Sequence, residues 1–125
     1  SLAEFYKEFE SALEELGLLN EIQKMHEHIF EKRKPIGYME KIVMKNNFKV
    51  IKKIQNKFHY RFVNSEAFFN HSIFKFHFLP VWVGILPEKR TVEVFTIVEE
   101  KLNEISLKNG ELVMTVPYVC FDCEK

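Results

Sequence analysis

The spacing of apolar residues predicts two helices at the start of the chain. Over residues 1–16 the apolar side chains recur every three to four positions, which predicts an amphipathic helix that ends at Gly17. A second stripe with the same spacing follows over residues 20–34 and should stop before Pro35. The first part of the chain is therefore expected to form a helical pair.

Residues 38–58 fit two secondary structures. Their apolar positions match one long helix, but residues 38–44 also match a short strand. The pair Asn46–Asn47 favours the second interpretation, because Asn is unfavourable inside a helix and favourable as an N-cap. We predict a strand over residues 38–44 and a helix over residues 48–57.

From Phe58 onward the apolar residues alternate with polar ones, which is typical of half-buried strands. The turn residues Asn109–Gly110 precede a last strand that ends near Pro117 or continues through Tyr118 and Val119. We predict strands over residues 58–63, 73–79 with a continuation over 81–85, 91–98 leading into a helix, and 112–116.

Together these elements predict a single α+β domain over residues 1–125. The N-terminal helical pair should pack on a mainly antiparallel sheet of about four to five strands, because helices cluster early and strands late. An apolar content of 46%, including 13 Phe, excludes a disordered chain, and no apolar run approaches the length of a membrane span. A basic leader followed by an apolar run is not visible, so we expect a cytoplasmic protein.

Composition also excludes several kinds of chemistry. The 4 Gly do not cluster, which excludes Rossmann and P-loop nucleotide sites. Asp122 is the only Asp, so metal-assisted phosphoryl transfer is disfavoured. The abundance of Lys and Glu is compatible with a thermophilic source and equally with an AT-rich genome.

The zero net charge conceals a strong segregation of charge. Residues 1–31 carry eight Glu against two Lys, and residues 32–65 carry ten Lys or Arg against one Glu. Residues 66–125 carry nine acidic against six basic residues. On the predicted helix, extended toward its N-terminus, the lysines share one stripe while the apolar residues face the core. The predicted polyanion-binding residues are Lys45, Lys49, Lys52, Lys53, Lys57 and Arg61.

These observations predict a non-enzymatic binding module whose basic central segment, residues 41–61, docks onto a polyanion, with nucleic acid as the first candidate. Two other interpretations of the segment stay open. In the first, the protein is a homo-oligomer or adaptor, and the basic segment pairs with acidic surfaces such as those of an acidic protein. In the second, the lysines only form a solvated face.

Histidines provide a further alternative. If residues 58–63 pair with residues 73–79, His59 and His77 share a basic face with Arg61 and Lys75, which would suit an anion site or a general acid. A small hydrolase or RNA-processing enzyme that uses His59, His71 or His77 is therefore a weaker prediction. The simpler interpretation is that the residues of this basic face are the outward ones of amphipathic strands.

Cys120 and Cys123 form a C-x-x-C pair near the end of the chain, with the spacing of half a zinc site. Two further ligands would have to come from His71 or His77, from a second chain, or from residues beyond Lys125. A local disulfide is another alternative. We expect free thiols, because two Cys do not complete a zinc site, and no other cofactor is predicted.

Overall fold

The computed structural model describes residues 2–125 and has an α+β fold. Within these residues, six α-helices accompany one two-stranded antiparallel sheet. No helix among them has the length and apolar character needed to cross a membrane. The elements in chain order are α1 Ala3–Glu15, α2 Leu19–Lys32, α3 Ile36–Lys45, β1 Lys49–Phe62, α4 Ser65–Asn70, the π-helix η1 Phe74–Phe78, α5 Leu79–Ile85, the 3₁₀-helix η2 Glu88–Arg90, α6 Thr91–Asn109 and β2 Leu112–Glu124.

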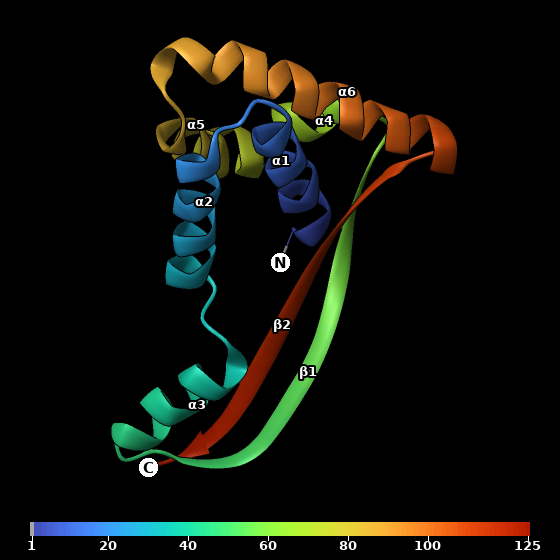
Figure 1. The fold of residues 1–125 in the computed structure, drawn as a ribbon. Coiled ribbons are helices and arrows are strands. Elements are labelled where there is room, and N and C mark those ends of the chain that lie inside the picture. The colour runs from blue at the N-terminus through green and yellow to red at the C-terminus, as the bar shows by residue number, and fades with distance from the viewer. Residues whose placement is uncertain (1) are drawn as a thin grey trace.

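The chain has two parts of different character. Helices α1, α2, α4, α5 and α6 form a compact cluster, and β1 and β2 run side by side away from it as a long curved ribbon (Figure 1). Helix α3 lies beside the far end of the ribbon and packs on β1. We call residues 36–57 and 117–125 the arm, and residues 2–35 and 58–116 the body.

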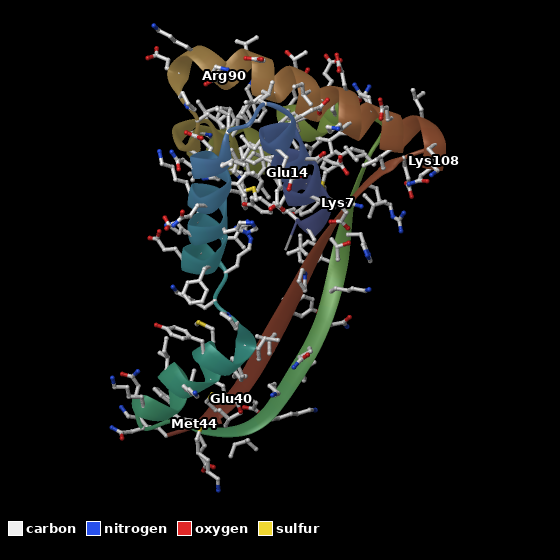
Figure 2. The ribbon with its side chains drawn as sticks, viewed as in Figure 1. Lys7, Glu14, Glu40, Met44, Arg90 and Lys108 are labelled. Atoms are coloured by element: carbon white, nitrogen blue, oxygen red, sulfur yellow. The ribbon has the colours of Figure 1, made fainter. Side chains whose placement is uncertain are left out.

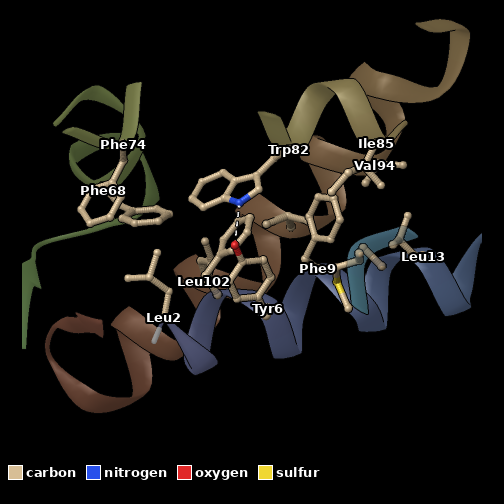
Figure 3. Packing of buried hydrophobic residues seen from close by; sticks show 14 of the residues in the cluster. Leu2, Tyr6, Phe9, Leu13, Phe68, Phe74, Trp82, Ile85, Val94 and Leu102 are labelled. Atoms are coloured by element: carbon tan, nitrogen blue, oxygen red, sulfur yellow. Dashed lines mark hydrogen bonds between the residues drawn. The ribbon is translucent and has the colours of Figure 1, made fainter. Parts of the chain in front are cut away.

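The body is held together by an aromatic core. Trp82 is fully buried and stacks on Phe5 with ring centroids 3.8 Å apart. Its indole N–H donates to the buried Tyr6 hydroxyl at 3.0 Å (Figure 3). Phe68 and Phe74 extend the cluster with ring centroids 4.7 Å apart. Because large rings bury much apolar area, this core stabilises the body.

The predicted sheet of about four to five strands with a helical pair packed on it is wrong. Residues 73–79 and 81–85 form η1 and α5 instead of strands. Phe74, Phe78 and Trp82 lie four residues apart, so they share one face of consecutive helical turns, and their neighbouring rings are 5.5 Å apart. Phe76, which completed the apparent alternation, is 66% exposed.

The predicted strand over residues 91–98 is also wrong, because this segment is the first half of α6. Its β-branched residues favour a strand, but Val94, Val98 and Leu102 recur every four residues and are completely buried. Burial of this helical stripe outweighs the weaker local preference for a strand.

The central segment has the reverse of the predicted order. Residues 38–44 lie in α3, and residues 48–57 lie almost entirely in β1. Asn47 has a φ of 68°, and it ends α3 in the left-handed conformation instead of starting a helix. The β1 segment is a strand because it pairs with β2 along its length, from Lys49 opposite Glu124 to Phe62 opposite Leu112.

Candidate functional site: the ribbon arm

The arm has no core of its own. None of its described residues is buried, whereas every buried residue of the described chain lies in the body. Its large exposed apolar side chains are Tyr38, Met39, Ile42, Met44, Phe48, Ile51, Ile54 and Tyr118. Met44 and Glu40 lie on α3 at the far end of the arm (Figure 2). A two-stranded ribbon is marginally stable alone, and the exposed apolar surface on this one makes the arm the candidate functional site.

One face of the ribbon continues the core outward. Residues directly opposite in an antiparallel pair share a face, and alternate residues along each strand do the same. Near the body this face carries Tyr60 and Phe62, which pack against the core. Farther out it carries Phe58, Tyr118 and Ile54, which are 45%, 43% and 46% exposed.

We call this outer part the open face. It begins at Phe58 on the edge of the body and continues over the arm residues Lys52, Ile54, Asn56, Tyr118, Cys120 and Asp122. Phe58 joins it to the core, because its ring centroid lies 5.5 Å from that of Tyr60 and 6.2 Å from that of Tyr118. The aromatic row therefore passes without a break from a covered region to an uncovered one.

The opposite face is partly covered by α3. Lys53 points from this face to Glu40 on α3, with 3.4 Å between Nζ and Oε2. Val119 and Phe121 share the face with Lys53 and are half-buried. The two faces of the outer ribbon therefore differ, and the open face is the more accessible one.

The predicted basic residues do not form a helical stripe. Lys45 ends α3, and the others lie on β1. Lys53, Lys57 and Arg61 share one face of the ribbon, and Lys52 lies on the other. Lys49 follows beyond a bulge at Ile51, where the register shifts. The side chains are exposed, but they point in several directions.

Two of these basic residues have acidic partners within the chain. Lys53 pairs with Glu40, and the Arg61 guanidinium donates to the carboxylate of Glu111. The segregation of charge nevertheless follows the architecture. The arm carries seven Lys against three acidic residues, or +4, and the rest of the chain carries the balancing −4.

A cleft lies where the ribbon leaves the body. It has a volume of about 600 Å³ and lies between residues 33–36 and the ribbon. Arg33 and Lys34 give it positive charge, and Pro117, Tyr118 and Val119 form its wall on β2. The Lys34 ammonium lies 5.4 Å from the centre of the Tyr38 ring, so its charge is held near the arm.

Cys120 and Cys123 are free thiols on β2. Three residues in a strand span about 10 Å, and an odd spacing points the two side chains to opposite faces. Cys120 is exposed on the open face and Cys123 is half-buried. Within residues 2–125, no three His, Cys, Asp or Glu side chains gather as a metal site would require. The strand therefore separates the two thiols that a turn would have brought together.

The histidines of the predicted enzyme lie in three different environments. His59 is exposed on β1, and His77 is exposed on η1, where it lines a cleft with His28. His71 is half-buried against the rings of Tyr60 and Phe74. Because residues 73–79 are helical, the predicted sheet face shared by His59 and His77 does not exist.

Sequence reasoning missed the apolar residues of the open face. The signal that could have identified them is the run from Leu112 to Phe121, in which only Thr115 is polar. Such near-continuous apolar runs are typical of strands that are covered on both faces.

Comparison with known proteins adds no relative, because no family model, curated protein or solved structure matches this chain.

Proposed function

We propose that this protein is a non-enzymatic binding module whose arm binds a polypeptide partner through the open face. The observation that carries the proposal is the continuation of the aromatic core onto uncovered surface at Phe58, Tyr118 and Ile54. Covering such a patch removes apolar area from water, and a protein partner can supply complementary apolar side chains. Lys52 and Asp122 at the outer end of this face would provide polar contacts at its rim.

Binding of a polyanion is the second candidate function. The exposed lysines of the arm support it, and nucleic acid is the first polyanion to test. The partners of Lys53 and Arg61 within the chain, and the apolar residues between the lysines, favour a protein. The two candidates depend on different side chains, so substitutions can separate them.

Two double variants test the proposals. Ile54→Ser with Tyr118→Ser removes apolar area and leaves the charges, whereas Lys49→Gln with Lys52→Gln removes charge and leaves the apolar area. Val92→Ser is the matched control, because Val92 lies on α6 in the body and is 80% exposed. All three changes are at exposed or partly exposed positions, so each variant is expected to fold.

The partner is identified first, and its affinity is measured second. A benzophenone attached to Cys120 in a Cys123→Ser background places a photo-crosslinker on the open face. The cross-linked protein is then purified and titrated by calorimetry against each variant. We expect the Ile54→Ser, Tyr118→Ser variant to bind about thirtyfold more weakly, since central interface residues contribute about 2 kcal/mol or more. Unchanged affinity in this variant contradicts the proposal.

A fluorescein-labelled oligonucleotide tests the second candidate. If the arm binds nucleic acid, the anisotropy should show an affinity that falls steeply with salt. The Lys49→Gln, Lys52→Gln variant should lower that affinity and the Val92→Ser control should not. Absence of binding at low salt eliminates this candidate.

A further inference from the structure

The two edges of the ribbon differ in their hydrogen bonds. On β2, the N–H of Thr115 donates to the Glu4 carboxylate at 3.0 Å, and its C=O accepts from the N–H of Leu2 at 2.8 Å. Both groups of Thr115 therefore point away from β1. In an antiparallel ladder alternate residues point the same way, so Pro117, Val119 and Phe121 also direct their backbone groups to the outer edge of β2.

The outer edge of β1 is protected. Lys53, Gln55 and Lys57 lie opposite Phe121, Val119 and Pro117, so their backbone groups point outward from β1. The N–H of Lys57 is occupied, because it donates to the side chain of Asn56 at 2.8 Å. Lysines on an edge strand discourage the addition of another strand. This edge is therefore an unfavourable place for a partner strand.

The outer edge of β2 beyond Pro117 has no such protection. Pro117 lacks an N–H, and at this position it costs the ladder nothing. In the described chain, no backbone hydrogen bond outside the ladder reaches Val119 or Phe121. Their side chains are apolar, and Val119 lines the cleft beside Arg33 and Lys34. This short edge has free donors and acceptors next to the exposed apolar surface.

We propose that a second copy of this chain adds its β2 antiparallel to β2 along this edge. The inference goes beyond the proposed function, because pairing at the edge leaves the open face accessible to a partner. A two-fold axis pairs one edge with itself, so the free groups of Val119 in one copy meet those of Phe121 in the other. The product is a four-stranded sheet in the order β1, β2, partner β2, partner β1.

Each arm carries a net charge of +4, so the fit of a second copy rests on one local charge contact and on the apolar surface. With Val119 opposite Phe121, Asp122 of each copy comes beside Tyr118 of the other, at the wall of the cleft that carries Arg33 and Lys34. The open faces of the two arms join into one apolar surface that spans both ribbons. The same contacts form twice, as a two-fold interface requires.

This register places Cys120 directly opposite Cys120 of the second copy. In such a non-hydrogen-bonded pair the Cα atoms are about 4.5 Å apart, which is within the range that a disulfide spans. Cys120 is exposed, so it reports on the pairing. Diamide, which takes up the two thiol hydrogens, should join the two copies in a Cys123→Ser background. Cys120→Ser is the negative control.

Light scattering over a range of concentrations provides a measurement that does not depend on the thiols. We expect a dimer in the wild type and in Val119→Thr, which keeps the backbone donor. In Val119→Pro, which removes the donor without removing a bond to β1, we expect dimerisation to weaken by about tenfold or more. Circular dichroism checks that Val119→Pro folds, and Phe121→Lys, which places a charge on the same edge, should weaken the dimer in the same way.

Three results would overturn the inference. They are a monomer at every concentration, a dimer that Val119→Pro and Phe121→Lys leave intact, and a dimer in which diamide does not link Cys120. The proposed function fails by a different result, namely a purified cross-linked partner that binds the Ile54→Ser, Tyr118→Ser variant as well as it binds the wild type. A monomeric protein whose arm binds another polypeptide would thus refute the self-pairing and support the binding function.

Discussion

Replacement of Glu4 by Gln tests how the ribbon is fixed to the body. Glu4 lies in the first turn of α1, and its carboxylate accepts from the Thr115 hydroxyl and, at 3.0 Å, from the Thr115 N–H. Thr115 lies two residues before the arm begins on β2. Glutamine would keep one acceptor and lose the charge, so the base of the ribbon would be held less firmly against α1.

The size of the effect follows from the exposure of this contact. A hydrogen bond to a charged group contributes about 1.5–3 kcal/mol when solvent is excluded. Glu4 is only partly buried, so water screens the interaction. We therefore expect Glu4→Gln to lower the free energy of unfolding by about 1 kcal/mol near neutral pH. Glu8→Gln is the control, because it removes the same charge one turn farther along α1.

The effect should depend on pH in one direction. Burial raises the pKa of the Glu4 carboxyl, but the hydrogen bonds from Thr115 and the nearby His59 outweigh burial, and the net pKa is lowered. A carboxyl with a lower pKa in the folded state stabilises the protein above its unfolded pKa, and this stabilisation is lost as pH falls through the folded pKa. The difference between wild type and Glu4→Gln should therefore be full above the ordinary pKa of a Glu carboxyl and should close as pH falls through the lowered pKa of the folded state.

Urea unfolding followed by the fluorescence of the single Trp, Trp82, measures this difference at each pH. A destabilisation that stays constant across the pH range would refute the assigned role of the carboxylate. So would a Glu8→Gln variant that loses as much stability as Glu4→Gln.

Three further predictions concern a buried hydrogen bond, a turn glycine and the two cysteines. Tyr6→Phe leaves the buried indole N–H of Trp82 without its acceptor and should cost about 1–3 kcal/mol in urea unfolding; a loss below about 0.5 kcal/mol would contradict it. Gly110→Ala places a side chain at a φ of 81° and should cost about 1 kcal/mol, seen as a lower Tm; an unchanged Tm would show that the turn relaxes. Cys120 and Cys123 should hold no zinc after dialysis, as elemental analysis would show; equimolar zinc that Cys120→Ser abolishes would disprove the separation of the thiols.

The first two helices could be predicted because their cores are local in sequence. In α1, Phe5, Phe9 and Leu13 recur at helical spacing and are completely buried, so the pattern and the packing agree. Gly17 has a φ of 70° two residues after the end of α1, which fits its prediction as a helix end. In α1 the local pattern and the burial therefore indicate the same structure.

The later elements could not be predicted, because their spacing of apolar residues fits both the two-residue period of a strand and the period of a helix. Phe74, Phe76 and Phe78 match both a strand and a helix, and only the contacts of Phe74 and Phe78 with the core decide between them. Pro80 is compatible with both as well, since it lies at the start of α5, where a missing N–H is harmless. The decision depends on Trp82 and on the distant α1, which a local pattern does not contain.

The charge of the arm can be read from the sequence, but its geometry cannot. The basic segment between Lys41 and Arg61 lies largely on the arm, and its binding of a polyanion stays a prediction. The register between β1 and β2 joins residues more than fifty positions apart, and it alone determines which side chains share a face. The lysines that were predicted to share one stripe of a helix therefore lie on both faces of the ribbon.

The same error explains why the arm exposes apolar side chains. On a helix, Val50, Ile51 and Ile54 would have shared one face opposite the lysines. The core of the chain itself would then have buried these apolar side chains. On β1 they are spread over both sides of the bulge, and Ile51 and Ile54 are 53% and 46% exposed. Apolar residues that a helix would have buried are thus left in water by the strand. Since β2 carries an apolar run on the same ribbon, the two strands together expose the surface that the proposed partner would cover.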